Sequence, residues 1–255
     1  MLISAPNFMR MCDIVLDPSF GHIDFSQDFS NKTIFVNTDY FEQVLPKLTQ
    51  SSNIFLVVHH SDRFFDRIMF EAVRKCTRKI FARNCDFIHP HIVQIPIGFV
   101  DAPPFPGQFM TRTRVDEKLL KSIRDANVQK DIETYVNVNL HGSETKFASV
   151  RALRQACLDA FSNDTERRPF PEFMKMLRRS KYVVCPMGFG IDTHRFFEAA
   201  YMKARPVVIS SNLDPLYKKF GAVILDSWDD PLPDVWEEPN VPEEYFHTDF
   251  WLKFK

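Results

Sequence analysis

Long apolar runs and paired cysteines are both missing from this 255-residue sequence. No stretch of about 18 apolar residues occurs, and the N-terminus has no signal-peptide pattern. The sequence therefore predicts no transmembrane segment and a cytoplasmic or otherwise soluble protein. The five cysteines are scattered and form no C-x-x-C pair, which favours reduced thiols over disulfides or a zinc site.

An excess of charge of either sign is also lacking. The 32 Lys and Arg residues nearly balance 33 Asp and Glu residues, and the formal net charge is −1. This balance argues against nucleic acid or an anionic membrane as a general partner. Hydrophobic residues at 45% and charged residues at 25% are ordinary for a globular protein, and the length allows one large domain or two compact ones.

The C-terminal half contains three short apolar runs separated by segments of helical character. These runs are Tyr182–Cys185, Pro206–Ile209 and Ala222–Leu225. Strands that alternate with helices pair in parallel, and helices then cover the faces of the sheet. We therefore expect a parallel α/β domain in this half of the chain.

Glycine is scarce, with seven residues, so the position of each glycine is informative. Gly188 and Gly190 lie in Pro186–Thr193, between the first of these predicted strands and a predicted helix, His194–Lys203. A glycine-containing loop between a parallel strand and a helix N-terminus is a typical phosphate site, because free N–H groups and the helix dipole point at the ligand.

The predicted helix carries charged residues at spacings that place them on one face. Arg195 and Glu198 are three residues apart, and His194 and Glu198 are four apart. Arg195 could bind a diphosphate, and Glu198 could accept hydrogen bonds from the diol of a ribose. Together they indicate a site for a nucleoside diphosphate. In the alternative interpretation, Asp192 or Thr193 caps the helix, and Arg195 and Glu198 form a solvated ion pair.

A dehydrogenase is a further alternative for the same loop. The letters G-F-G-I-D-T form a broken G-x-G-x-x-G fingerprint, in which Thr193 replaces the third glycine. No acidic residue lies beside the end of the next predicted strand, at Ser210–Ser211, so the dinucleotide pattern is incomplete.

The N-terminal region, residues 1–101, has the same rhythm of strands and helices. The β-branched and aromatic runs Thr33–Val36 and Ile54–Val58 predict strands, with a helix at Phe41–Thr49 between them. The uninterrupted second run predicts a central strand buried on both faces. A helix and two more strands are expected after it, at Arg63–Cys76, Lys79–Ala82 and Ile92–Ile95.

Titratable residues follow that central strand directly. The sequence His59-His60-Ser61-Asp62 stands at the carboxyl end of the predicted strand, where open α/β sheets bind ligands. Asp62 is also placed to cap a helix beginning at Arg63. Asp39 follows the preceding strand, where a turn role beside Asn37 competes with a functional one.

The sequence predicts no metal site. Adjacent histidines on a strand point to opposite faces, so His59 and His60 do not share an ion without a bend. His89 and His91 have no third ligand in the same stretch. No Asp-x-Asp pair occurs, and such a pair holds the divalent ion of metal-dependent sugar transferases.

A second strand-to-loop transition opens the C-terminal half. Tyr135–Leu140 predicts a strand that leads into His141-Gly142-Ser143, followed by a helix at Lys146–Ala160. Ser143 and Arg151 are placed to contact the same phosphate, Arg151 in a bidentate manner. The alternative is that Ser143 is an N-cap and Arg151 is exposed. A further helix is predicted at Pro171–Arg179.

The proline-rich stretch Asp101–Arg114 predicts the domain boundary. Aromatic residues in Glu243–Lys255 are spaced for one face of a terminal helix. The expected organisation is an N-terminal domain (1–101), a linker with a connecting helix at Val115–Val128 (102–130), a C-terminal domain (131–228), and a tail with the terminal helix (229–255).

Two blocks of motifs resemble the exostosin-like glycosyltransferases. The C-terminal block reads S-K-Y-V-V-C-P-M-G-F-G, then R-F-F-E-A, then P-V-V-I. The N-terminal block reads V-V-H-H-S-D, then I-F-A-R-N, then I-P-I-G-F. The two blocks together cover about half of the chain. One departure is Ala204–Arg205, where the family usually has Gly-Cys before the strand.

This resemblance implies the GT-B architecture, in which two Rossmann-like domains face each other across a cleft. It also implies an inverting, metal-independent transfer of a sugar from a UDP-sugar, such as UDP-xylose, UDP-glucuronate or UDP-galactose, to a glycan hydroxyl. Because Golgi members of the family are membrane-anchored, the chain could also be an excised domain of such an enzyme. The alternatives are a non-catalytic module that binds nucleotide sugars or glycans, and a Rossmann oxidoreductase.

On this interpretation the N-terminal domain supplies a general base and the C-terminal domain binds the donor. We expect Asp62 to be the base, with His60 second and Asp39 third. The donor ligands are expected to be Ser143, Arg151, Gly188, Gly190, Asp192, Thr193, His194, Arg195 and Glu198.

Overall fold

The computed structural model describes residues 1–20, 23–100, 116–140 and 148–253. The chain divides into two compact units, one formed by Met1–Ile97 with His247–Lys255 and the other by Gly98–Phe246. Each unit is built on one parallel sheet with helices, which confirms the predicted α/β class. The proline-rich stretch predicted as the boundary, 101–114, lies outside the described residues, and so do the loop residues 141–147 with Ser143.

The sheet of the first unit has five parallel strands in the order β1-β2-β3-β4-β5. The strands are β1 (Ile14–Leu16), β2 (Thr33–Asn37), β3 (Ile54–His59), β4 (Thr77–Ala82) and β5 (Ile92–Gln94). The central strand β3 is almost entirely buried, as its uninterrupted apolar run predicted.

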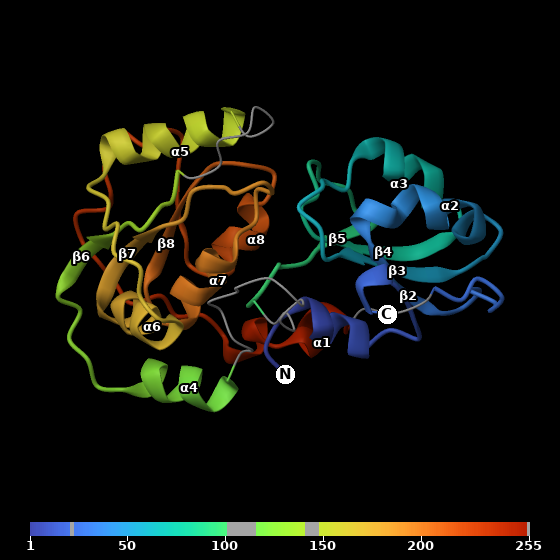
Figure 1. The fold of residues 1–255 in the computed structure, drawn as a ribbon, viewed down its shortest axis with the longest axis horizontal. Helices are drawn as coiled ribbons and strands as arrows, with labels where there is room; N and C mark the ends of the chain where they lie inside the picture. The colour runs from blue at the N-terminus through green and yellow to red at the C-terminus, as the bar shows by residue number, and fades with distance from the viewer. Residues whose placement is uncertain (21–22, 101–115, 141–147, 254–255) are drawn as a thin grey trace. The chain divides into compact units, whose positions relative to one another are not determined.

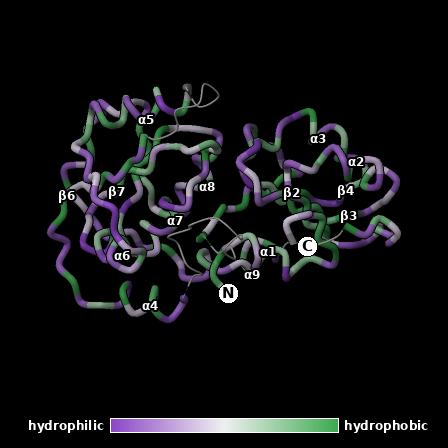
Figure 2. The backbone as a smooth tube through the Cα atoms, in the orientation of Figure 1, coloured by the Kyte–Doolittle hydropathy of each residue, from purple (hydrophilic) through white to green (hydrophobic). Residues whose placement is uncertain are grey.

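Helices cover both faces of this sheet (Figure 1). α2 (Phe41–Thr49) and α3 (Arg67–Val73) pack on one face, where strand residues such as Ile34 and Leu56 join their buried core. α1 (Ala5–Arg10) lies on the opposite face, where the ring of Phe8 is 5.2 Å from that of His59. Hydrophobic residues accordingly recur along the strands in Figure 2.

The second unit has four parallel strands in the order β6-β7-β8-β9. Its strands are β6 (Ile132–Tyr135), β7 (Ser180–Val184), β8 (Arg205–Ile209) and β9 (Val223–Leu225). Its helices are α4 (Glu117–Asp125), α5 (Ala148–Ala160), α6 (Phe170–Arg179), α7 (His194–Tyr201) and α8 (Asp214–Lys218).

Two layers enclose this second sheet. Tyr182 and Val184 of β7 point into a core that includes Cys157 of α5 and aromatic residues of the tail, Trp228 and Trp236. In Figure 1, α6 and α7 lie on the side of the sheet away from α5. The strands β7, β8 and β9 and the helix α7 match the predicted elements to within about two residues.

Strand order rises without reversal in both sheets. A doubly wound Rossmann sheet reverses its order at a switch point, and ligands bind there. Among the described strands neither sheet has that reversal. The feature of the fold that remains relevant to binding is the edge at which the carboxyl ends of all the parallel strands meet.

The helix predicted at Arg63–Cys76 begins later than expected, at Arg67. Its N-cap is Asp66, whose side chain accepts a 2.9 Å hydrogen bond from the Met69 N–H. The alternative role for Asp62 as the cap of this helix is therefore wrong.

The strand predicted at Tyr135–Leu140 is also displaced, because β6 ends at Tyr135. Beyond it, the Asn163 side chain accepts from the Val138 N–H at 2.9 Å and donates to the Val138 carbonyl at 3.0 Å. A side-chain amide thus takes the place that a neighbouring strand would have, so the residues after Tyr135 carry a strand-like sequence without pairing.

The terminal helix predicted at Glu243–Lys255 is interrupted. A 3-10 turn, Glu243–Phe246, and the short helix α9, Thr248–Trp251, flank His247, whose backbone is extended. His247 is extended because it forms an antiparallel bridge with Leu2.

The sequence did not predict α1 or β1. Short 3-10 turns follow β1 and β2 at Pro18–Phe20 and Thr38–Tyr40.

Within the part of the chain that the structure describes, no helix combines the length and apolar character that a membrane span needs.

Candidate functional site

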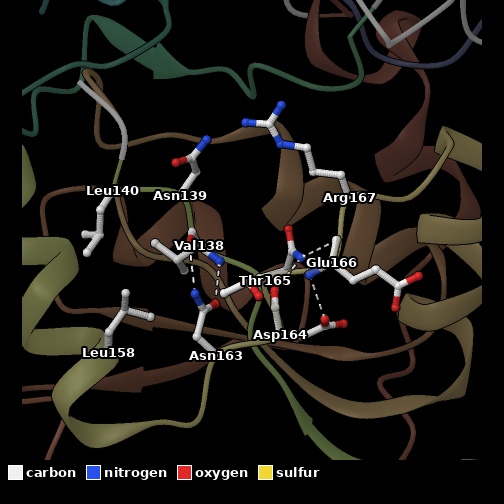
Figure 3. A pocket seen from close by; sticks show the side chains of 10 residues that line it. Val138, Asn139, Leu140, Leu158, Asn163, Asp164, Thr165, Glu166 and Arg167 are labelled. Carbon is white, nitrogen blue, oxygen red and sulfur yellow. Dashed lines mark hydrogen bonds between the residues drawn. The ribbon is translucent and has the colours of Figure 1, made fainter. Parts of the chain in front are cut away.

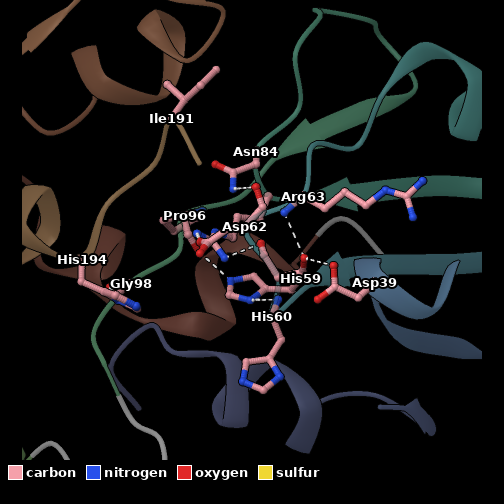
Figure 4. Close-up of polar contacts among 12 residues, drawn as sticks. Asp39, His59, His60, Asp62, Arg63, Asn84, Pro96, Gly98, Ile191 and His194 are labelled. Carbon is pink, nitrogen blue, oxygen red and sulfur yellow. Dashed lines mark hydrogen bonds and ion pairs between the residues drawn. The ribbon is translucent and has the colours of Figure 1, made fainter. Parts of the chain in front are cut away.

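Polar side chains gather at the carboxyl edge of the first sheet (Figure 4). Each of the first four strands contributes some, because parallel strands end at the same edge. They are Asp17 after β1, Asn37 at the end of β2 with Asp39 beyond it, His59 at the end of β3 with His60 to Asp62 beyond it, and Arg83 and Asn84 after β4.

His59 is a structural residue at this edge, with only 1% of its surface exposed. Its Nδ1 accepts a 2.7 Å hydrogen bond from the His60 N–H. Nδ1 therefore carries no proton, and Nε2 donates to the Pro96 carbonyl at 3.1 Å. Main-chain groups thus hold His59 as one neutral tautomer.

His60 leaves the strand with a left-handed backbone, φ = 62°. A non-glycine residue at such an angle is held there by its surroundings at a cost of about 1–3 kcal/mol. Its Nδ1 is 2.6 Å from Oδ2 of Asp17, and 26% of the His60 side chain is exposed. The structure therefore pairs a partly exposed imidazole with a fully buried carboxylate.

Asp17 is fixed by three further hydrogen bonds. Oδ1 accepts from the Ser19 N–H at 3.0 Å and from the Ser19 hydroxyl at 2.6 Å, and Oδ2 accepts from the Asn37 amide at 3.2 Å. Burial alone would raise the pKa of Asp17, but the hydrogen bonds from His60 and Ser19 outweigh it and hold that pKa below its ordinary value.

The other two predicted bases are exposed carboxylates with different partners. Asp62 is 3.1 Å from the guanidinium of Arg83, a buried residue that also donates to the Ser61 carbonyl at 2.6 Å. Asp39 accepts a 2.6 Å hydrogen bond from the Ser61 hydroxyl. The structure therefore brings the three predicted bases to one edge but gives only His60 a carboxylate partner.

In the second unit, the predicted glycine loop lies between β7 and α7. The Gly188 N–H donates to the Gly190 carbonyl at 3.0 Å, and the Tyr217 hydroxyl donates to the Ile191 carbonyl at 3.2 Å. Thr193 is the N-cap of α7, but its side chain makes no capping hydrogen bond. The Thr193 carbonyl accepts from the Phe196 N–H at 3.1 Å, so Thr193 contributes to the first turn of α7 through its backbone and not through its hydroxyl.

Arg154 of α5 reaches this loop, although the sequence pointed to Arg151. Its guanidinium donates to the Met187 carbonyl at 3.2 Å and to the Asn139 carbonyl at 2.9 Å, and a Cβ on Gly188 would lie 3.5 Å from it. Burial lowers the pKa of Arg154. No carboxylate among the described residues pairs with this cation, and Arg151 is exposed.

The predicted charged residues of α7 are less exposed than a solvated ion pair would be. Glu198 is fully buried and Asp192 is 3% exposed, whereas Arg195 is half-buried, with its guanidinium 5.8 Å from the Phe173 ring centre. His194 Nδ1 lies 2.7 Å from the Gly98 carbonyl. The solvated-pair alternative is therefore wrong, and Glu198 would contact a ribose only if its surroundings moved.

A pocket of about 300 Å³ opens at the carboxyl end of β6 (Figure 3). Leu140 and Leu158 line one side, and Asn139 and Arg167 lie on another. Because Arg154 donates to the Asn139 carbonyl as well as to the glycine loop, the pocket and the loop are joined through one side chain.

The cysteines are all free thiols. Burial raises the pKa of Cys157 to about 11 and that of Cys185 to about 12, so neither is a thiolate nucleophile near neutral pH. Across the described ranges, no three His, Cys, Asp or Glu side chains gather as metal ligands.

No model of a known protein family matches the chain, and no curated protein matches it either. The resemblance to exostosin-like glycosyltransferases therefore stays a prediction.

Sequence reasoning missed Asp17 and Arg154. Asp17 was missed because the short strand β1 carries a weak pattern of only three residues. Arg154 had a usable signal: it falls four residues after Val150 and three before Cys157, on the apolar stripe that continues to Phe161.

A stability measurement tests the structural role of His59. His59→Ala should lower the free energy of unfolding by at least about 2 kcal/mol, because it leaves a buried N–H and a buried carbonyl unpaired. Urea unfolding followed by circular dichroism measures this loss. Glu71→Gln is the comparison and should stay within about 1 kcal/mol of wild type, since Glu71 and its partner Arg74 are both exposed. Equal losses would contradict the structural role of His59.

Proposed function

We propose that this protein is an inverting, metal-independent glycosyltransferase that moves a sugar from a nucleotide-diphosphate sugar to a glycan hydroxyl. The motif resemblance favours a UDP-linked donor. The second unit binds the donor and the first supplies the base. This division of roles requires that the two units close on one donor and one acceptor, as in the GT-B architecture.

The observation that carries this proposal is the guanidinium of Arg154 at the β7–α7 loop, which has no carboxylate partner among the described residues. A partly buried cation whose hydrogen bonds in the described structure go to carbonyls has charge left for an anion. The loop beside it precedes a helix N-terminus, which also favours negative charge. A diphosphate matches both features.

The neighbouring groups suit the remainder of a nucleotide. The pocket beside Asn139 has a volume at the lower end of the range for small-ligand sites and combines apolar with amide surface. Arg195 adds a second cation at the start of α7. Charge that develops on the leaving diphosphate would then be stabilised by guanidinium groups and helix N–H groups, without a metal ion.

Inversion needs one base, which removes the acceptor proton as the hydroxyl oxygen attacks the anomeric carbon from the face opposite the diphosphate. The carboxyl edge of the first sheet offers His60, Asp62 and Asp39 for that task.

The direct test is a transfer assay with a panel of UDP-, GDP- and ADP-sugars and glycan acceptors. Proton NMR should show a product whose anomeric configuration is opposite to that of the donor. Nucleotide-sugar binding without transfer to any acceptor would instead indicate a binding module. Binding of NAD(P)H with hydride transfer would indicate an oxidoreductase.

Donor binding should depend on Arg154. Arg154→Met should weaken UDP binding by about 1.5–3 kcal/mol, the value of a hydrogen bond to a charged group, measured by isothermal titration calorimetry. Arg179→Met is the matched control, because Arg179 is exposed and pairs with Asp131 at another part of the unit. The same UDP affinity in wild type and Arg154→Met, with both folded, would move the diphosphate site elsewhere.

Transfer should not depend on a divalent ion. Initial rates in excess EDTA are expected to equal those in buffer, because side-chain cations and helix N–H groups take the place of a metal. Activity that vanished on chelation and returned with Mn²⁺ would show that this assignment of charge stabilisation is wrong.

A further inference from the structure

We propose that His60 is the catalytic base of this reaction and that Asp17 is its positioning residue. This role rests on the proposed function. It departs from the sequence-based preference for Asp62. The contact between Asp17, which follows β1, and His60, which follows β3, carries the proposal.

The hydrogen bonds of Asp17 favour its ionised form, which accepts a hydrogen bond from His60. Oδ1 receives two hydrogen bonds from Ser19, and Oδ2 receives one from Asn37 in addition to the contact with His60. A carboxylate whose oxygens accept four hydrogen bonds has little capacity left for a proton of its own. Its remaining effect is to hold the imidazole.

The tautomer of His60 follows from this contact. Because Asp17 accepts at Nδ1, the neutral ring carries its proton on Nδ1 and its lone pair on Nε2, at the opposite side of the ring. The backbone of His60 is left-handed, and about a quarter of its side chain is exposed to solvent. Nε2 is therefore the atom that receives the acceptor proton.

The other groups at this edge are less suited to the task. Main-chain bonds occupy both nitrogens of His59. Asp62 neutralises the buried Arg83, and protonating Asp62 would leave that guanidinium without its carboxylate. Asp39 accepts from Ser61, whose hydroxyl also accepts from the Arg63 N–H.

The step balances without a further reactant. The acceptor oxygen forms a bond to the anomeric carbon while its proton passes to Nε2 of His60. The bond between the anomeric carbon and the diphosphate oxygen breaks, and its electron pair leaves with the nucleoside diphosphate. The resulting imidazolium lies against the Asp17 carboxylate and afterwards releases its proton to water.

The test combines kinetics with ¹⁵N NMR of the imidazole. Asp17→Asn and His60→Asn should each lower kcat by about 10²–10⁴-fold, with the KM for the donor changed less than about threefold. Asn tolerates the left-handed backbone at position 60. The double variant should be no slower than the worse single variant, because the two residues act as one unit. Asp28→Asn, an exposed carboxylate in the same unit, should keep the wild-type rate.

In wild type, long-range ¹H–¹⁵N spectra should show a protonated Nδ1 and an unprotonated Nε2 for His60, and Asp17→Asn should lose this tautomer. Full kcat in either single variant, or the same tautomer in wild type and Asp17→Asn, would overturn the proposal. If wild type transfers no sugar, the proposed function fails and the catalytic role fails with it. The NMR comparison would then still decide whether Asp17 positions His60.

Discussion

Parallel pairing of the strands is the constraint on which both candidate sites depend. It places the carboxyl ends of β1 to β4 at one edge of the first sheet, so residues as distant in sequence as Asp17 and His60 meet at 2.6 Å. The same constraint brings the loop after β7 beside the segment after β6, where one guanidinium contacts both. Neither arrangement needs the strand-order reversal of a doubly wound sheet.

The two edges hold complementary chemistry. The first contains an imidazole whose tautomer is set by a buried carboxylate, and this is a group for moving a proton. The second contains a glycine loop, a helix N-terminus and a cation without a described carboxylate partner, and these are groups for holding an anion. The glycosyl transfer that we propose would use both kinds of group, one for the hydroxyl nucleophile and the other for the diphosphate leaving group.

The sequence predicted the strands and helices whose apolar patterns are long, such as β3 and α6, and the loop before α7. It did not predict β1, because three residues give too little periodicity, and so Asp17 was missed. The sequence indicated Arg151 at the phosphate because Arg151 is nearer to the predicted loop in sequence. Arg154 reaches the glycine loop instead, because it is on the apolar face of α5 that packs toward the sheet. The burial of Glu198 depends on tertiary packing, which helical spacing alone does not reveal.

The proposed function requires that a nucleoside diphosphate bind at the β7–α7 loop beside Arg154. A titration of the ¹⁵N-labelled protein with UDP, followed by ¹H–¹⁵N NMR, tests it most directly. We expect the largest shifts at Gly188, Gly190 and the first turn of α7, and at the side-chain Nε of Arg154. Saturable shifts confined to other parts of the chain, or no shifts at millimolar UDP, would contradict it.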